Sequence, residues 1–160
     1  MRRLLDALAT ALALLGGALL LAVALLTVVS VVGRWLASQP ITGDIELVQL
    51  ATAASIALFL PYCQSHGSHL IVDFFTARSS GPVQRRLDAA CSVLAGGLFL
   101  LLAWRAGIAV AEMRSAGETT MVLGVPLWMP YAAMVPGLAL AGVIGLEQPF
   151  RQRAPLRGAT

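Results

Sequence analysis

The residues best suited to bind a metal or to react in this 160-residue chain lie between positions 63 and 73. Cys63, His66 and His69 follow one another at intervals of three, and Asp73 comes four residues later. Thiolate, imidazole and carboxylate groups all bind zinc, but a structural zinc site needs four ligands that converge. The spacing here matches none of the paired patterns that mark zinc sites. We therefore expect no metal, and interpret both histidines as residues of a membrane–water interface.

Other kinds of site chemistry are disfavoured by the positions of the ionisable residues. Haem ligation inside a membrane bundle needs histidines within the helices, and neither histidine lies in a long apolar run. A transporter that is coupled to a proton or an ion normally keeps an ionisable residue within the membrane. Here only Arg105 comes close, at the edge of an apolar run. Because the sequence also lacks a nucleophile paired with a base and a phosphate-binding loop, it predicts neither an enzyme nor a bound cofactor.

Long apolar runs identify the class of protein. Hydrophobic residues make up 58% of the chain and charged residues 12%, whereas soluble domains carry about a quarter charged residues. Uncharged stretches of 27, 19, 16 and 28 residues cover 7–33, 47–65, 89–104 and 119–146. A membrane-spanning helix needs about 20 mainly apolar residues. The third stretch is short, but the Arg105 guanidinium at its end can reach the headgroups.

These runs predict an all-α integral membrane protein with four transmembrane helices in a single membrane domain. Backbone polar groups within lipid must bond inside their own segment, so each run must be helical. The predicted helices cover about residues 6–37, 45–65, 83–114 and 126–148, with the last starting at Pro126, and a polar tail, 149–160, follows. Two alternatives remain open after Arg105: a helix that continues beyond the headgroups, or a hydrated loop.

A short amphipathic helix is predicted between the second and third spans, at about residues 69–78. Asp73 and Thr76 lie on one side of its helical wheel, and the opposite arc is apolar, formed by Leu70, Ile71, Val72, Phe74 and Phe75. This segment is too short to cross a bilayer and too apolar for a solvated loop. The pattern indicates a helix lying flat at the interface.

The arginines predict the orientation, since the chain has no lysine. If the N-terminus is inside, the cytoplasmic segments hold eight arginines and the outer segments three. Basic residues concentrate on the cytoplasmic side of membrane proteins, and aromatic residues gather at the interfaces. Trp35, Trp104 and Trp128 all lie at predicted outer helix ends. Both termini are therefore expected in the cytoplasm, and the net charge of +3 reflects topology and not a nucleic-acid-binding surface.

Small residues recur every four positions in three of the predicted helices, and in the third helix they are Ala103, Gly107 and Ala111. Ala9, Ala13 and Gly17 share one face of the first helix. The longest such face is in the fourth helix, formed by Ala133, Gly137, Ala141 and Gly145. Small residues let helix backbones approach closely within membranes. We predict helix–helix contacts on these faces, either inside the bundle or with a partner.

Two carboxylates, Asp44 and Glu46, stand at the predicted start of the second helix. Negative charge there complements the positive end of the helix dipole. Helix capping and solvation are therefore the first interpretation of these residues, and contact with a partner is the alternative.

Three ordered patterns resemble one family of membrane proteins. The first is Arg34-Trp35 followed by residues 40–47, the second is residues 69–73, and the third is residues 117–120, then 123–131, then Pro136-Gly137. With four spans and this length, the chain resembles the small membrane subunit of tripartite ATP-independent periplasmic (TRAP) transporters, the DctQ-like family. The resemblance covers nearly the whole chain.

The resemblance implies a non-catalytic scaffold subunit in a bacterial inner membrane. A periplasmic substrate-binding protein would capture an organic acid, and a large membrane subunit would move it inward, driven by an ion gradient. The small subunit would support the large one and help to dock the binding protein. The candidate docking or partner-interface residues are Arg34, Asp44, Glu46, His69, Asp73, Trp128, Gly137, Ala141 and Gly145. An autonomous homodimeric exporter and a metal- or haem-binding redox anchor are the alternatives.

The predicted orientation is tested by labelling in intact cells. In a background lacking Cys63 and Cys91, single cysteines at Gly43 and Gly117 should react with a membrane-impermeant thiol reagent, because both positions are expected outside. Labelling of Gly158→Cys without lysis would reverse the assignment.

Overall fold

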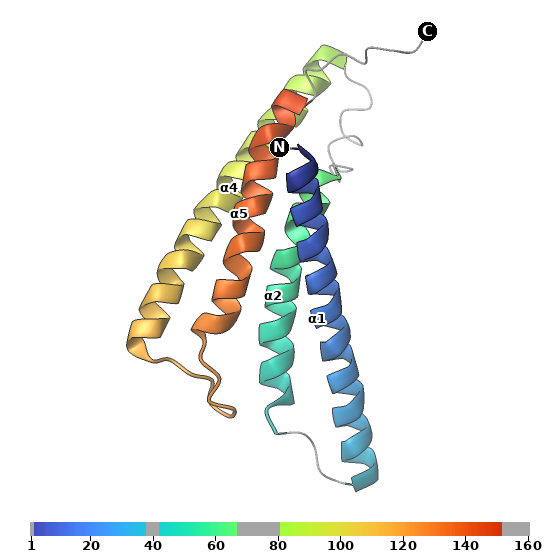
Figure 1. The fold of residues 1–160 in the computed structure, drawn as a ribbon, viewed down its shortest axis with the longest axis vertical. Coiled ribbons are helices and arrows are strands. Elements are labelled where there is room, and N and C mark those ends of the chain that lie inside the picture. The colour runs from blue at the N-terminus through green and yellow to red at the C-terminus, as the bar shows by residue number, and fades with distance from the viewer. Residues whose placement is uncertain (1, 38–41, 67–80, 152–160) are drawn as a thin grey trace.

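The computed structural model describes residues 2–37, 42–66 and 81–151, which form four helices (Figure 1). They are α1 (Arg2–Ala37), α2 (Asp44–Ser65), α4 (Gly81–Ala116) and α5 (Trp128–Arg151). Each is long and apolar enough to cross a membrane, which confirms the predicted all-α membrane fold. The amphipathic helix predicted at 69–78 lies outside the described residues.

The third and fourth spans differ in detail from their predicted limits. Helix α4 runs without interruption through Arg105 to Ala116, so the structure shows the continuing helix and not the hydrated loop. Its 36 residues correspond to about 54 Å, well beyond a hydrocarbon core of about 30 Å. Helix α5 begins at Trp128 instead of Pro126. Pro126 pairs with Thr119 in an isolated β-bridge, which keeps its backbone extended.

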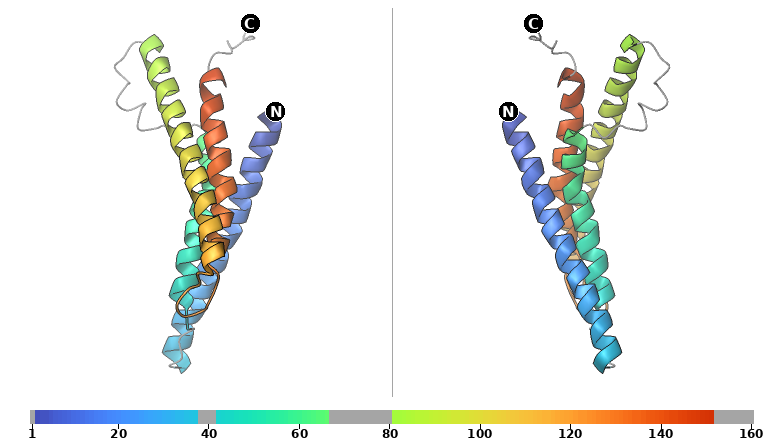
Figure 2. Two further views of the ribbon diagram at one scale, coloured as in Figure 1. Left: turned by 90° about the vertical axis from the view of Figure 1, so that its left-hand side faces the viewer. Right: turned by 90° about the vertical axis from the view of Figure 1, so that its right-hand side faces the viewer.

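The helices pack in the spatial order α1, α2, α5, α4, so that α2 and α5 form the centre of the bundle. In Figure 1 the helices appear in this order, with α1 and α4 on the outside and α2 and α5 between them. Figure 2 shows the same bundle from two further sides. Contacts between α1 and α5 are few. The two outer helices, α1 and α4, thus each rest mainly against one neighbour.

A narrow seam attaches α1 to α2. Its buried residues, Ala9, Gly16, Val23 and Ser30, recur every seven positions. A seven-residue repeat returns to nearly the same side of a helix, as in coiled coils. A Cβ on Gly16 would lie 3.1 Å from Leu58 Cβ, so the helices nearly touch there.

The four-residue face predicted for α1 therefore shares only its first residue with the seam. Ala13 and Gly17 lie half-buried beside the seam and line a groove with Phe59 and Tyr62 of α2. Most other residues of α1 between Asp6 and Arg34 are apolar, and many are exposed, as for Leu25 and Val29. A helix that is apolar all round and exposed is suited to lipid or to another membrane protein.

The small-residue face of α5 packs inside the bundle. A Cβ on Gly137 would lie 2.2 Å from Ala57 O of α2, and one on Gly145 would lie 2.8 Å from Gly96 Cα of α4. Ala141, between them, is 0% exposed. Of the two alternatives left open by the sequence, the structure shows the internal contact. Gly137, Ala141 and Gly145 are covered by the chain's own helices, so they do not form a surface that a partner can reach.

The backbone contact at Gly137 predicts a specific sensitivity. Gly137→Ala places a methyl group against the α2 backbone, and overpacking of this kind costs about 1–3 kcal/mol. We expect the melting temperature of the detergent-solubilised chain, followed by circular dichroism, to fall by several degrees. The matched control is Gly107→Ala, because a Cβ there meets nothing within 4 Å. The control should leave the melting temperature unchanged or raise it through better helix propensity. Equal melting temperatures for the two variants would contradict the close approach of α2 and α5.

Candidate functional site

One end of the bundle holds the α1–α2 connection and the loop of residues 117–127 between α4 and α5. We call it the loop end (Figure 1). Four of the predicted site residues lie there: Arg34 on the last turn of α1, Asp44 and Glu46 on the first turn of α2, and Trp128 at the start of α5. His69 and Asp73 lie outside the described residues. The loop end is therefore where the sequence-based candidates converge.

Asp44 links α1 to α2 through its carboxylate. The hydroxyl of Ser30, which is only 1% exposed, donates a hydrogen bond to Asp44 Oδ2. The backbone N–H of Ile45 donates to Asp44 Oδ1 at 2.8 Å. The residue before the helix, Gly43, has no side chain to cap it, so the carboxylate of Asp44 serves the first turn in its place. Capping and an interhelix contact are thus combined in one side chain.

Glu46 holds the distant α4–α5 loop. The backbone N–H of Val122 donates to Glu46 Oε1 at 3.0 Å, and that of Leu123 donates to Oε2 at 3.1 Å. Both carboxylate oxygens are used, and hydrogen bonds to an ionised acceptor are stronger than neutral ones. The interaction joins residues 76 and 77 positions apart in the sequence. It fixes the loop tip against the first turn of α2.

The loop has a defined backbone of its own. Helix α4 ends at Ala116 and is followed by Gly117, whose φ of 66° is left-handed. Glu118 N donates to Met113 O at 3.2 Å, which completes a Schellman motif. The two strands of the loop then pair, since Leu127 N donates to Glu118 O at 3.0 Å. Thr120 N donates to Val125 O at 2.9 Å on the same ladder. These bonds make residues 117–127 a short hairpin-like structure.

The loop tip presents apolar side chains. Met121 is 100% exposed and Val122 is 54% exposed. Leu123 instead turns toward α2, where a Cβ on Gly43 would lie 2.4 Å from Leu123 Cγ. Gly43 also has a φ of 84°, which side chains rarely adopt, so glycine satisfies both requirements. The tip is anchored by Leu123 and Glu46 while Met121 projects from it.

A cation–π contact closes the base of the loop. The guanidinium carbon of Arg114, on the last turn of α4, lies 5.4 Å from the centre of the Trp128 ring. Such contacts contribute about 0.5–1 kcal/mol at exposed sites. The Trp128 ring thus connects the helix that enters the loop to the helix that leaves it.

The pattern around Cys63 is resolved in part. His66 stacks on Tyr62 with ring centroids 4.1 Å apart, and its Nδ1 lies 2.9 Å from Ser65 Oγ. Its backbone N–H donates to Tyr62 O, so His66 ends α2 as a cap. Within residues 2–37, 42–66 and 81–151, no three His, Cys, Asp or Glu side chains are grouped closely enough to hold a metal ion.

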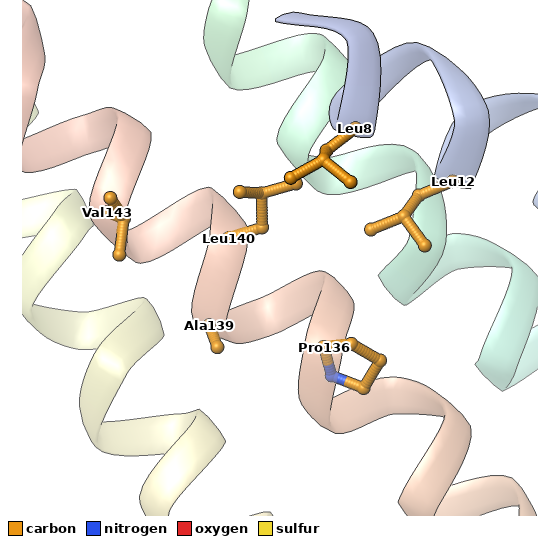
Figure 3. Close-up of a pocket in the computed structure, with 6 residues that line it drawn as sticks. All are labelled: Leu8, Leu12, Pro136, Ala139, Leu140 and Val143. Carbon is orange, nitrogen blue, oxygen red and sulfur yellow. The ribbon is translucent and has the colours of Figure 1, made fainter. Parts of the chain in front are cut away.

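A groove lies between α1 and α5, away from the loop end. Its volume is about 390 Å³ (Figure 3). Its lining is wholly apolar: Leu8, Leu12, Pro136, Ala139, Leu140 and Val143. The side chains of Leu8 and Leu12 point from α1 toward α5 (Figure 3). No polar side chain lines this groove, so it offers little to a carboxylate or an ion.

Comparison with known protein families decides the class. The family described as "Tripartite ATP-independent periplasmic transporters, DctQ component" matches residues 23–154. The chain belongs to this family. A comparison with curated proteins gives no match. The matched range includes the whole loop end, from Ser30 on α1 to Trp128 on α5.

As a DctQ component, the chain is the small membrane subunit of a TRAP transporter and associates with other TRAP components. Membership favours this class over a homodimeric exporter or a redox anchor. It agrees with the structure of the loop end, where the carboxylates and the aromatic ring make static contacts within the chain.

Several residues of the DctQ loop end were missed by sequence reasoning. Ser30 gave no signal except its place seven residues after Val23 on the seam. Arg114 was counted only as an outer arginine. The backbone N–H groups of Val122 and Leu123 carry no sequence signal. The two glycines with positive φ in the loop, Gly117 and Gly124, are the feature that could have indicated an ordered hairpin there.

The Glu46 contact predicts how this DctQ loop responds to mutation. Glu46→Ala removes the acceptor of two backbone N–H groups, so amide exchange at Val122 and Leu123 should accelerate severalfold or more. Hydrogen–deuterium exchange with peptides covering residues 117–127 measures this. Glu112→Ala is the control, since it removes an exposed carboxylate from the last turns of α4 at the same end of the bundle. Unchanged exchange in Glu46→Ala would show that the hairpin is ordered without α2.

Proposed function

We propose that this DctQ component is the scaffold subunit that supports the large membrane subunit and helps to dock a periplasmic substrate-binding protein. The transporter takes up an organic acid across a bacterial inner membrane, and an ion gradient drives the uptake. Family membership supports the transporter class, and the geometry of the loop end supports the docking role.

One observation supports the docking role: Met121 is fully exposed on a loop whose backbone is held in place. Exposed apolar side chains on ordered backbone are suited to protein contact, because binding then costs little ordering entropy. Methionine also adapts its shape to a partner surface. The Glu46 bonds and the hairpin ladder supply the ordered backbone beneath Met121.

The scaffold role is supported by the helix surfaces. The span of α1 between Asp6 and Arg34 has no ionisable residue, so it offers no pathway for a charged substrate. Its exposed apolar side chains fit lipid or the large subunit. The α1–α5 groove is likewise lined only by apolar side chains. Substrate recognition is therefore assigned to the other components.

The orientation completes the proposal. The arginine distribution favours cytoplasmic termini, which puts the loop end in the periplasm, where the binding protein is found. Met121→Cys is a more conservative labelling site than Gly43→Cys, because Met121 is fully exposed while Gly43 has a left-handed backbone against Leu123.

The docking role is tested by titrating the binding protein against uptake. In proteoliposomes holding both membrane subunits, Met121→Asp should raise the concentration of binding protein needed for half-maximal uptake about tenfold, equivalent to about 1.4 kcal/mol. The maximal rate and the affinity of the isolated binding protein for its organic acid should not change, because Met121 touches neither the substrate nor the translocation pathway.

The control is Ser115→Asp, which adds the same charge to an exposed position on the last turn of α4. If Met121→Asp and Ser115→Asp both required the wild-type concentration of binding protein, the tip would not be a docking surface. Uptake by the small subunit alone in liposomes would overturn the scaffold role itself.

A further inference from the structure

The groove between α1 and α2 has a volume of about 570 Å³, against about 390 Å³ for the groove between α1 and α5. It lies toward the end of the bundle opposite the loop end. We call this the terminus end, because α1 begins there and α5 ends there (Figure 1). Gly17 forms part of its floor, where a Cβ would lie 3.7 Å from Phe59 Cζ, an ordinary contact distance. Leu14 and Leu21 form the outer wall and are 71% and 63% exposed.

The groove has the length of one leaflet of a bilayer. Its lining on α1 runs from Thr10 to Leu21, which corresponds to about 16 Å of helix at about 1.5 Å per residue. Half of a hydrocarbon core of about 30 Å is about 15 Å. A partner helix that crosses the membrane would need a continuous face along both leaflets. A single acyl chain needs only the length that this groove offers.

Oxygen-bearing side chains line the groove only at its mouth, the part nearest the terminus end. They are Thr10 of α1 and Tyr62 on the last turn of α2. The Tyr62 ring is stacked on His66, with ring centroids 4.1 Å apart, and His66 is exposed. Amphipathic rings such as tyrosine gather at membrane–water interfaces. The mouth of the groove is therefore suited to the headgroup level, and its deeper part to hydrocarbon.

Arg3 places a positive charge beyond the mouth. It precedes Thr10 by seven residues and Gly17 by fourteen, so all three lie on nearly the same side of α1. Arg3 is exposed, and its long stem can bring the guanidinium into the headgroup layer, which is about 5–8 Å thick on each side. Asp6, on the same side, already has an interaction within the chain. A guanidinium binds phosphate well because it can donate two parallel hydrogen bonds.

We propose that this groove binds one phospholipid from the leaflet at the terminus end, with an acyl chain against Gly17 and Phe59 and the phosphate at Arg3. The chain gains little hydrophobic free energy by leaving the bilayer, because lipid tails are as apolar as the groove. Retention of the lipid therefore depends on the bonds between its phosphate and Arg3 and on close packing along the groove. The bound chain fills the hollow beside the seam that joins α1 to α2.

The first test is photo-cross-linking in vesicles of phosphatidylethanolamine that hold both membrane subunits. The probe is a phosphatidylglycerol with a diazirine at the end of one acyl chain. Irradiation should attach it to peptides covering residues 14–21 and Phe59, as identified by mass spectrometry. A diacylglycerol with the same chain and no phosphate should label these peptides about fivefold less, since one arginine near a membrane surface contributes about 1 kcal/mol. Equal labelling by the two probes, or no labelling by either, would overturn the proposal.

Variants of the groove and of Arg3 test the two parts of the site separately. Gly17→Leu fills the floor and should reduce labelling by phosphatidylglycerol at least fivefold, without a clash, because the space beside Gly17 is open. Gly97→Leu is the matched control, since it adds the same side chain to an exposed glycine of α4 whose Cβ would meet nothing within 4 Å. Arg3→Gln should reduce labelling about fivefold, and Arg3→Lys should retain most of it because the charge remains. Wild-type labelling in Gly17→Leu would show that the chain does not enter the groove.

A helix of the large subunit is the rival occupant of the groove. It would cover residues 14–21 in the complex, so the phosphatidylglycerol probe would label the small subunit alone but not the complex. That result would exclude the bound lipid. Similar labelling with and without the large subunit is the outcome that the proposal requires.

Discussion

The backbone contact between Gly137 and Ala57 sets the spacing of the whole bundle. In lipid, apolar side chains gain nothing by leaving one helix surface for another, so helices are held by close packing and by polar bonds. A Cβ at position 137 would lie 2.2 Å from a carbonyl oxygen of α2, which brings the two central helices into backbone contact. The outer helices are then placed relative to this pair. α1 follows α2 along its seam, and α4 follows α5 through the Gly96–Gly145 contact.

Polar bonds lock the central pair at both ends. At the loop end, Glu46 of α2 holds the hairpin that leads into α5. At the other end, Gln148 of α5 donates to the Gln64 carbonyl of α2. The Glu46 bonds join α2 to the loop that leads into α5, and the Gln148 bond joins α2 to α5 directly, so the two helices are held against sliding as well as against separation. The centre of the bundle is thus held by contacts within the chain, and the apolar outer surfaces of α1 remain exposed.

The fold was predictable to the extent that lipid restricts the backbone. Long uncharged runs must be helical, so the four spans followed from the sequence, whereas the choice after Arg105 between a continuing helix and a loop was left open until the structure showed α4 reaching Ala116. The α1 seam was not predictable from small-residue spacing alone, because its buried positions include Val23 and Ser30 as well as Ala9 and Gly16. Gly137 was expected in a helix contact, but the sequence could not choose between α2 and a partner.

The candidate site was predictable only as a set of residues. Asp44, Glu46 and Trp128 were identified, and the structure brings them to one end. Their partners are the buried Ser30 hydroxyl, the backbone N–H groups of the loop and the Arg114 guanidinium. These pairings depend on how the α1–α2 hairpin packs against the α4–α5 hairpin. No local sequence pattern predicts that packing.

The long separation between Glu46 and its partners has a consequence for biogenesis. Val122 and Leu123 follow Glu46 by 76 and 77 residues, which at about 5–20 residues per second corresponds to roughly 4–15 s of translation. During that interval the first hairpin can already be in the membrane while its carboxylate faces only water. The loop end is completed when the last hairpin is inserted beside it. A nascent chain that stalls before Val122 therefore displays a free Glu46 and a bare Gly43, a surface that distinguishes unfinished subunits from finished ones.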